Sequence, residues 1–254
     1  MSSRTPPHQR LARRIADLFS AFPNVEAIAL AGSGITGAMD RESDIDLYVY
    51  ITSIIPLRDR AAIVEQLGAT RADMNLQFWD LGDEWYDAET GIEVDVMYWH
   101  TSWIEDQLDR VLVEHQASMG YSTCFWHTIR NSLILYDRSG WLCRLKEKSD
   151  VPFPEALRRA IIAKNHPVLR RVIPSYLHQI EKALRRHDLV SINHRVAALL
   201  ASYFDVLFAL NRLPHPGEKR LLETASERCA KVPREMVTQV GEILCAAASP
   251  DQSL

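Results

Sequence analysis

Two short apolar runs separated by a polar turn, AIALAGSGITGAMDRESDIDLYVY (residues 27–50), constrain this chain more than any other segment. The first run delivers Gly32 and Ser33, and the second carries Asp44 and Asp46 two residues apart. Residues two apart on a strand project from the same face. The two carboxylates therefore point the same way and repel each other, which a fold tolerates when a cation lies between them. A divalent metal ion is the usual cation.

The composition is that of an ordinary soluble globular protein, with 47% apolar and 24% charged residues among 254. This length suits one large domain or two small ones. The net charge of −4 lacks the basic excess of a dedicated nucleic-acid binder, although local basic patches remain compatible with it. We therefore expect no nucleic-acid partner.

The sequence carries no signal for a membrane or for export. No apolar run approaches the roughly 18 residues that span a bilayer, and the first 19 residues lack the apolar core of a secretory signal. The four cysteines form no CxxC pair, which argues against a thiolate metal site or a disulfide framework. We expect a cytoplasmic protein with reduced thiols.

Hydrophobic periodicity predicts both strands and helices in the first part of the chain. The predicted helices are 8–21, 57–67 and 102–118, and the predicted strands are 26–31, 45–51, 74–80, 91–99 and 132–140. The acidic segment 81–91 is expected to be the loop of a hairpin.

The charged and proline-rich segment 146–154 marks the expected boundary between a domain at 1–149 and a domain at 150–254. Beyond it the strand patterns disappear, and helices are predicted at 155–164, 168–187, 190–212, 217–230 and 233–247. The third of these is apolar nearly all round, which places it at the buried centre of a bundle. The predicted fold class is α+β, with an N-terminal mixed β-sheet and flanking helices followed by an all-α helical bundle.

The strand predicted at 91–99 adds a third carboxylate, because its alternation turns Glu93 and Asp95 away from the core. If this strand neighbours 45–51 in one sheet, Asp95 joins the first two aspartates, with Glu93 beside them. The alternative is that all of these carboxylates simply lie on the solvent face of half-exposed strands.

A Gly-Ser turn, a gap of ten residues, Asp-Ile-Asp and a lone Asp on a later strand together resemble the nucleotidyltransferase superfamily, whose fold is polymerase-β-like. The layout is similar to the antibiotic, or aminoglycoside, branch, in which a helical domain follows the catalytic domain. The resemblance runs from Gly32 to Asp95 and bears on fold and reaction class rather than on the acceptor. The turn lacks the G-x-x-x-x-G-K-[ST] pattern, so this is not a P-loop protein.

The resemblance implies that Gly32 lets the backbone approach a triphosphate and that Ser33 hydrogen-bonds its β- or γ-phosphate. It implies two Mg²⁺ ions held by Asp44, Asp46 and Asp95, which agrees with the preference of Mg²⁺ for carboxylates plus phosphate oxygens. The expected reaction is attack of an acceptor hydroxyl on the α-phosphate of a nucleoside triphosphate, expected to be ATP. Pyrophosphate is released, and positioning and charge neutralisation supply most of the catalysis.

The helical half is expected to supply cations for the triphosphate. Lys219 lies at the start of a predicted helix, where anions are favoured. Arg195 lies on the most apolar helix, where a charge needs a partner or a cleft. An ion pair with Asp205 is the structural alternative for Arg195.

A general base must be a carboxylate near Asp95, and Glu93 is the local candidate. Glu105 and Glu114, on the helix that follows, are the alternatives, and His127 and His194 could also act, although an isolated histidine is more often structural.

Three functions stay open on the sequence. The first is a nucleotidyltransferase for a small hydroxylated acceptor such as an aminoglycoside-like antibiotic. The second is a toxin-like relative that modifies a protein or tRNA, which the net negative charge disfavours. The third is a degenerate nucleotide-binding regulator, which has little need for the full set of carboxylates.

Overall fold

The computed structural model describes residues 6–32, 44–78 and 80–248. The chain divides into two compact units. Unit one comprises Met1–Leu108 and Thr128–Asp150, and unit two comprises Asp109–His127 and Val151–Leu254. Residues 109–127 thus belong to the second unit although they precede the charged segment at 146–154.

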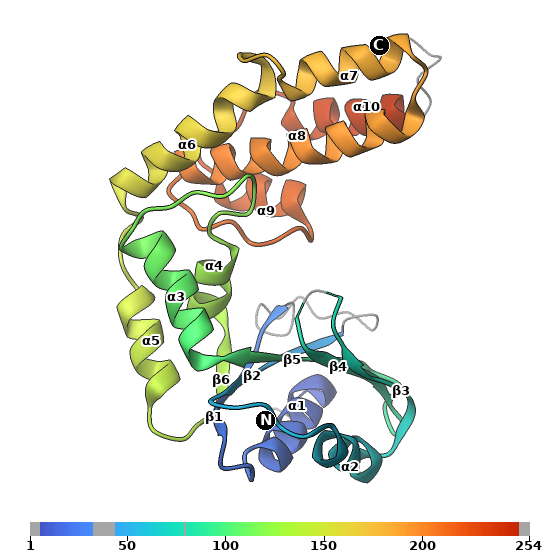
Figure 1. Cartoon of the computed structure of the whole chain (residues 1–254), viewed down its shortest axis with the longest axis vertical. Helices are drawn as coiled ribbons and strands as arrows, with labels where there is room; N and C mark the ends of the chain where they lie inside the picture. The colour runs from blue at the N-terminus through green and yellow to red at the C-terminus, as the bar shows by residue number, and fades with distance from the viewer. Residues whose placement is uncertain (1–5, 33–43, 79, 249–254) are drawn as a thin grey trace, which may run out of the picture. The chain divides into compact units, whose positions relative to one another are not determined.

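Unit one is built on a mixed β-sheet, which confirms the α+β class (Figure 1). In the part of the chain that the structure describes, six strands lie in the order β3-β4-β5-β2-β1-β6. Their bounds are β1 Val25–Leu30, β2 Ile45–Ile51, β3 Ala69–Leu76, β4 Gly82–Asp87, β5 Glu93–His100 and β6 Leu133–Asp137. The neighbours β2 and β5 run parallel, whereas the other neighbouring strands pair antiparallel.

Helices α1 (Pro7–Phe19) and α2 (Leu57–Leu67) cover one face of the sheet (Figure 1). Their apolar stripes pack on the alternate residues that β2 and β5 turn toward them. The buried core includes Ile15, Phe19, Ile63, Leu67, Ile45, Leu47, Val49, Val94 and Val96. Because one face of both strands is committed to this core, the intervening residues must project from the other face.

Helix α5 (Trp141–Ser149) packs against β1 and β6. Its Trp141 ring lies 5.3 Å, centroid to centroid, from that of Tyr50 on β2. Tyr50 follows Asp46 by four residues, which places it on the same face of β2, and it is buried. The remaining helices of this stretch are α3 (Thr101–Leu112), shorter than the predicted 102–118, and α4 (Cys124–Asn131), for which the sequence gives no expectation.

Two predictions at the β3 edge of the sheet are wrong. Strand β4 runs through the segment expected to be an acidic loop, and β3 begins at Ala69 rather than at residue 74. Strand β3 lacks the apolar alternation of a half-buried strand because most of its residues are exposed. Strand β4 does alternate, but Asp83 and Asp87 occupy two of its buried positions. A strand with acidic residues at buried positions cannot be recognised from an alternation of apolar residues in the sequence.

A buried ion pair explains how Asp83 is accommodated. Its carboxylate lies 2.5 Å from the Arg60 guanidinium of α2 and accepts a hydrogen bond of 2.7 Å from the Tyr98 hydroxyl. Arg60 also donates to the Ile55 carbonyl and to the Asn75 side chain. Both charges are therefore hydrogen-bonded as well as paired, which burial requires. The network joins α2, β3, β4 and β5.

We predict that Asp83→Asn lowers the free energy of unfolding by about 3 kcal/mol, because it leaves a buried guanidinium without its counter-charge. Urea denaturation of the full chain measures this loss. Glu89→Gln is the matched control, since the Glu89 side chain is 82% exposed in a long ion pair, and it should cost less than about 0.5 kcal/mol. Equal losses in the two variants would show that the buried pair is not a stabilising element.

Unit two is helical, as expected. Its helices include α6 (Glu155–Arg170), α7 (Tyr176–Arg185), α8 (Leu189–Leu210), α9 (Leu221–Arg228) and α10 (Met236–Ala248). Helix α8 contacts all four of the others, which confirms its place at the centre. Helix α6 continues through Pro167, although the sequence predicts a break there. Every helix of the described residues is too short or too polar to cross a bilayer.

The buried carboxylate of Asp205 ties residues 118–122 to the bundle. Asp205 accepts hydrogen bonds from the Ser122 hydroxyl (2.6 Å), the Ser122 N–H (3.1 Å) and the Asn165 side chain (3.1 Å). Asn165 in turn accepts from the Gly120 N–H. These contacts favour the charged form, but burial outweighs them and raises the pKa of Asp205 to about 6.

The pKa of Asp205 predicts a pH dependence of stability. Between pH about 4 and about 6 the folded state keeps a proton that the unfolded chain has lost, so stability falls as the pH rises through this window. Between pH about 4.5 and about 7, the free energy of unfolding of Asp205→Asn should rise by roughly 2 kcal/mol relative to that of the wild type. Amide hydrogen exchange in α8 at the two pH values measures this. A stability difference between Asp205→Asn and the wild type that is the same at both pH values would contradict this prediction.

Candidate active site

The register of β2 and β5 places Asp46 directly beside Asp95. The residues that follow each of them, Leu47 and Val96, are buried in the core, so the two carboxylates project from the opposite face. Neighbouring strands of a sheet lie about 4.8 Å apart. Both aspartates are only half-buried. The condition set by the sequence, that these two strands are neighbours, is confirmed.

Gly32 packs directly against the Asp46 carboxylate. A Cβ atom at this position would lie 2.0 Å from Asp46 Oδ2, and the φ of +69° is one that L side chains rarely adopt. The N–H of Ala31 donates to the Asp46 carbonyl at 2.9 Å, which fixes this approach of the two backbones. Position 32 must therefore be glycine if Asp46 is to keep its place. Ser33, the expected phosphate contact, lies outside the described residues.

Asp44 and Glu93 occupy equivalent places at the start of the two strands, because each precedes a member of the Ile45–Val94 pair. Asp44 is half-buried, whereas Glu93 is exposed. The Tyr86 hydroxyl donates to Glu93 Oε2 at 2.9 Å, and this hydrogen bond raises the pKa of Tyr86 above its usual value. Tyr86 thus restrains the carboxylate that the sequence suggests as a general base.

The sheet continues the row of carboxylates beyond Asp95. Strand β4 pairs Glu84 with Asp95, and β3 pairs Asp73 with Glu84. Four neighbouring strands therefore contribute one row on one face, in the order Asp46, Asp95, Glu84 and Asp73. Arg71 neutralises the outermost member, with its guanidinium 3.0 Å from Asp73. The sequence predicts a loop at Glu84, because the buried acids of β4 hide this strand, and it assigns no role to Asp73.

The Asp46–Asp95 pair fits a magnesium ion. Mg²⁺ usually takes one or two protein carboxylates and completes its shell with water and substrate phosphates. Across the described residues, no three acidic, histidine or cysteine side chains gather as an all-protein metal cage. The pair suits an ion that arrives with a phosphate, and the role of Asp44 as a further ligand stays a prediction.

The same face becomes aromatic further along both strands. Tyr48 follows Asp46 by two residues, and its ring centroid lies 4.1 Å from that of Trp99 on β5. Trp103 of α3 packs on Trp99 at 5.4 Å. The Trp99 N–H donates to Asp80 at 3.0 Å. Packed aromatic rings occupy this end of the face. The polar groups available for chemistry therefore lie at the other end, which carries the carboxylates.

The two cations expected from the helical half belong to unit two. Arg195 is exposed on α8, and Asp205 binds Ser122 and Asn165 instead of forming the alternative ion pair. Lys219 is exposed and lies two residues before α9. Their contact with a triphosphate stays a prediction.

We predict that Gly32→Ala displaces the Asp46 carboxylate. Gly91→Ala is the matched control, because Gly91 has a φ of +70° and no atom within 4 Å of its would-be Cβ. Both variants should lose about 1 kcal/mol of stability from backbone strain. Only Gly32→Ala should shift the carboxyl ¹³C resonance of Asp46. An unshifted resonance in Gly32→Ala would contradict the close packing of these two residues.

Neither a scan against protein-family models nor a search of curated proteins gives a match. Among solved structures the chain is similar to a nucleotidyltransferase-like protein from Exiguobacterium sibiricum 255-15, at TM-score 0.41 and 13% identity over 94% of this chain and 72% of that one. It is similar to the Thermotoga maritima CCA-adding enzyme complexed with tRNA, at TM-score 0.37 and 12% identity over 97% of this chain and 72% of that one. It is also similar to spectinomycin adenyltransferase from Enterococcus faecialis with ATP and spectinomycin, at TM-score 0.31 and 13% identity over 96% of this chain and 98% of that one. The strand order and register, rather than these overlays, define the α+β fold described above.

Proposed function

We propose that this chain is a Mg²⁺-dependent nucleotidyltransferase that moves AMP from ATP to a hydroxyl of a small acceptor and releases pyrophosphate. One observation carries this proposal: Asp46 and Asp95 lie side by side on parallel strands, with Gly32 packed against Asp46. Two adjacent carboxylates repel each other and so favour a dication between them. The motif from Gly32 to Asp95 that resembles nucleotidyltransferases supports the same reaction.

The residues of unit one would divide the work as follows. Asp46 and Asp95, with Asp44, would hold the ion, which when bound neutralises charge on the triphosphate and on the departing pyrophosphate. Gly32 would leave room for both the Asp46 carboxylate and a phosphate, because it has no Cβ. Catalysis of this kind rests on positioning and electrostatic stabilisation rather than on covalent chemistry with the protein.

A general base must take the proton of the acceptor hydroxyl, and two glutamates flank Asp95. Glu93 lies two residues before it on the same strand and is restrained by Tyr86, whereas Glu84 lies opposite it on β4. We assign the base to Glu93, because a restrained carboxylate is better placed for proton transfer. Glu84 is the alternative.

We further propose that the acceptor is a small cationic molecule such as an aminoglycoside-like antibiotic, whose modification would confer resistance. The carboxylates of Asp46, Asp95 and Glu84 give this face the negative charge that an amine-bearing acceptor requires. The four cysteines are free thiols, which suits a cytoplasmic enzyme that draws on cellular ATP.

We predict that Asp46→Asn and Asp95→Asn each lower Mg²⁺-dependent pyrophosphate release by at least about 10³-fold, since each removes charge that would hold the ion. The assay uses ATP, Mg²⁺ and a panel of aminoglycosides and other hydroxylated acceptors. Asp73→Asn is the control, because Arg71 already neutralises this carboxylate, and it should retain most of the rate. Glu93→Gln should lower kcat by about 10²- to 10⁴-fold if Glu93 is the base.

Full activity in Asp46→Asn would refute the proposed site. If labelled nucleotide appeared on a protein or tRNA instead of a small molecule, the chemistry would stand and the acceptor would change. ATP binding without turnover would replace the enzyme by a nucleotide-binding regulator.

A further inference from the structure

The net charge of −4 is the sum of a negative net charge on unit one and a positive net charge on unit two. Unit one carries 21 acidic against 13 basic residues, a net charge of −8, whereas unit two carries 12 against 16, a net charge of +4. The low whole-chain charge predicts no nucleic-acid partner, but unit two by itself is basic. A basic helical unit has the charge sign that a polyanion requires.

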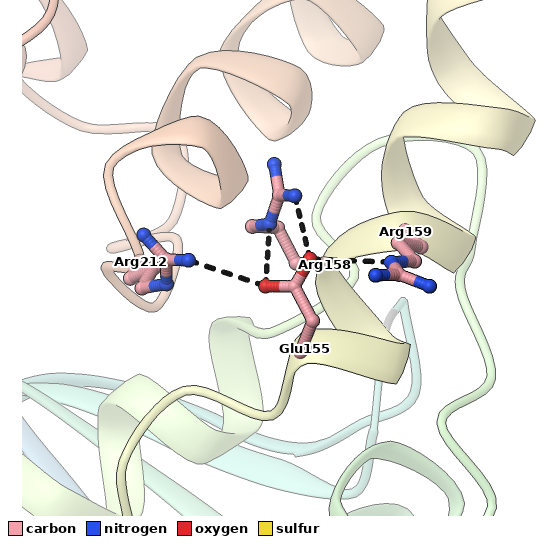
Figure 2. A network of polar contacts seen from close by, with 4 residues as sticks. All are labelled: Glu155, Arg158, Arg159 and Arg212. Atoms are coloured by element: carbon pink, nitrogen blue, oxygen red, sulfur yellow. Dashed lines mark hydrogen bonds and ion pairs between the residues drawn. The ribbon is translucent and has the colours of Figure 1, made fainter.

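The basic character is organised around one carboxylate at the start of α6. Figure 2 shows Arg212 and Arg159 approaching Glu155 from opposite sides, with Arg158 between them. Arg158 donates two hydrogen bonds to Glu155, of 2.9 and 2.6 Å. Arg159 and Arg212 donate one each, both of 3.2 Å. These three guanidiniums hold the pKa of Glu155 down to about 2, so the carboxylate stays ionised.

One carboxylate cannot neutralise three guanidiniums, so the cluster keeps an excess of two positive charges. The side chains of Arg159 and Arg212 are 77% and 57% exposed. Each of these two guanidiniums uses one nitrogen to donate to Glu155, so its other two nitrogens are able to donate elsewhere. Guanidinium forks match the geometry of phosphate oxygens. Glu155 therefore holds two exposed forks in place, which lowers the entropy lost when they bind.

The outer face of α6 extends this surface. Arg159, His166 and Arg170 are all exposed, and their spacing of seven and four residues places them on one stripe of the helix. Arg171 follows directly at the end of α6 and is exposed as well. The stripe is about 16 Å long, at about 1.5 Å per residue. That length can follow several phosphates of a nucleic-acid strand.

We infer that unit two binds the phosphate backbone of a nucleic acid through an arginine surface. This surface consists of Arg158, Arg159, Arg170, Arg171 and Arg212. Its contacts are guanidinium groups, which bind phosphate oxygens, so it recognises backbone charge rather than base sequence. The inference goes beyond the proposed nucleotidyl transfer and does not depend on it.

The test is the binding of the full chain to a fluorescein-labelled mixed-sequence RNA of about 20 nucleotides, followed by fluorescence anisotropy without ATP or Mg²⁺. Binding should weaken by about 50-fold between about 50 and about 200 mM salt, as expected for about four phosphate contacts on a single strand. The double variant Arg159→Ala/Arg212→Ala should reduce the salt slope by about 1.4 and weaken binding at least tenfold at low salt.

The matched control is Arg13→Ala/Arg58→Ala, which removes two exposed arginines from unit one and should leave the RNA affinity unchanged. Equal losses in the two double variants, or no anisotropy change at about 50 mM salt, would overturn the inference. So would binding to phosphatidylserine vesicles that exceeds binding to the RNA, because the partner would then be a membrane. Because the assay contains no ATP, its outcome is independent of the pyrophosphate-release test.

Discussion

The parallel pairing of β2 with β5 is the constraint on which the candidate site depends. It commits Leu47 and Val96 to the core, and their neighbours in sequence, Asp46 and Asp95, are thereby forced together on the other face. A shift of one residue in this register would bury the carboxylates and expose the core side chains. The energy that holds the two like charges together therefore comes from hydrophobic burial on the opposite face of the same strands.

Two features add to this constraint at the ends of the carboxylate row. Gly32 allows the backbone after β1 to lie against the Asp46 carboxylate, which a side chain at position 32 would displace. On the other side, the buried pair of Arg60 and Asp83 fixes β4 against α2, and β4 carries Glu84 into the row. The buried acid and the exposed acid of β4 thus have separate physical roles, although they are adjacent in sequence.

The site can be predicted from the sequence where a strand obeys simple alternation. The pattern of residues 45–51 predicts a shared face for Asp44 and Asp46, and that of residues 91–99 turns Asp95 away from the core, without a structure. It fails for β4, because a buried Asp83 that is satisfied by Arg60 reads as a loop residue. Pairing across strands also lies beyond a single sequence, so the position of Glu84 next to Asp95 needed the sheet register. The organisation of three arginines by Glu155 joins residues up to 57 positions apart, which local patterns do not report.

The central claim is that Asp46 and Asp95 together hold a divalent ion that accompanies a nucleoside triphosphate. Electron paramagnetic resonance of Mn²⁺ with a non-hydrolysable ATP analogue tests it most directly, because it needs no acceptor. The wild type and Asp73→Asn should bind Mn²⁺ with the analogue, whereas Asp46→Asn and Asp95→Asn should not. Undiminished Mn²⁺ binding in either of the last two variants would contradict it.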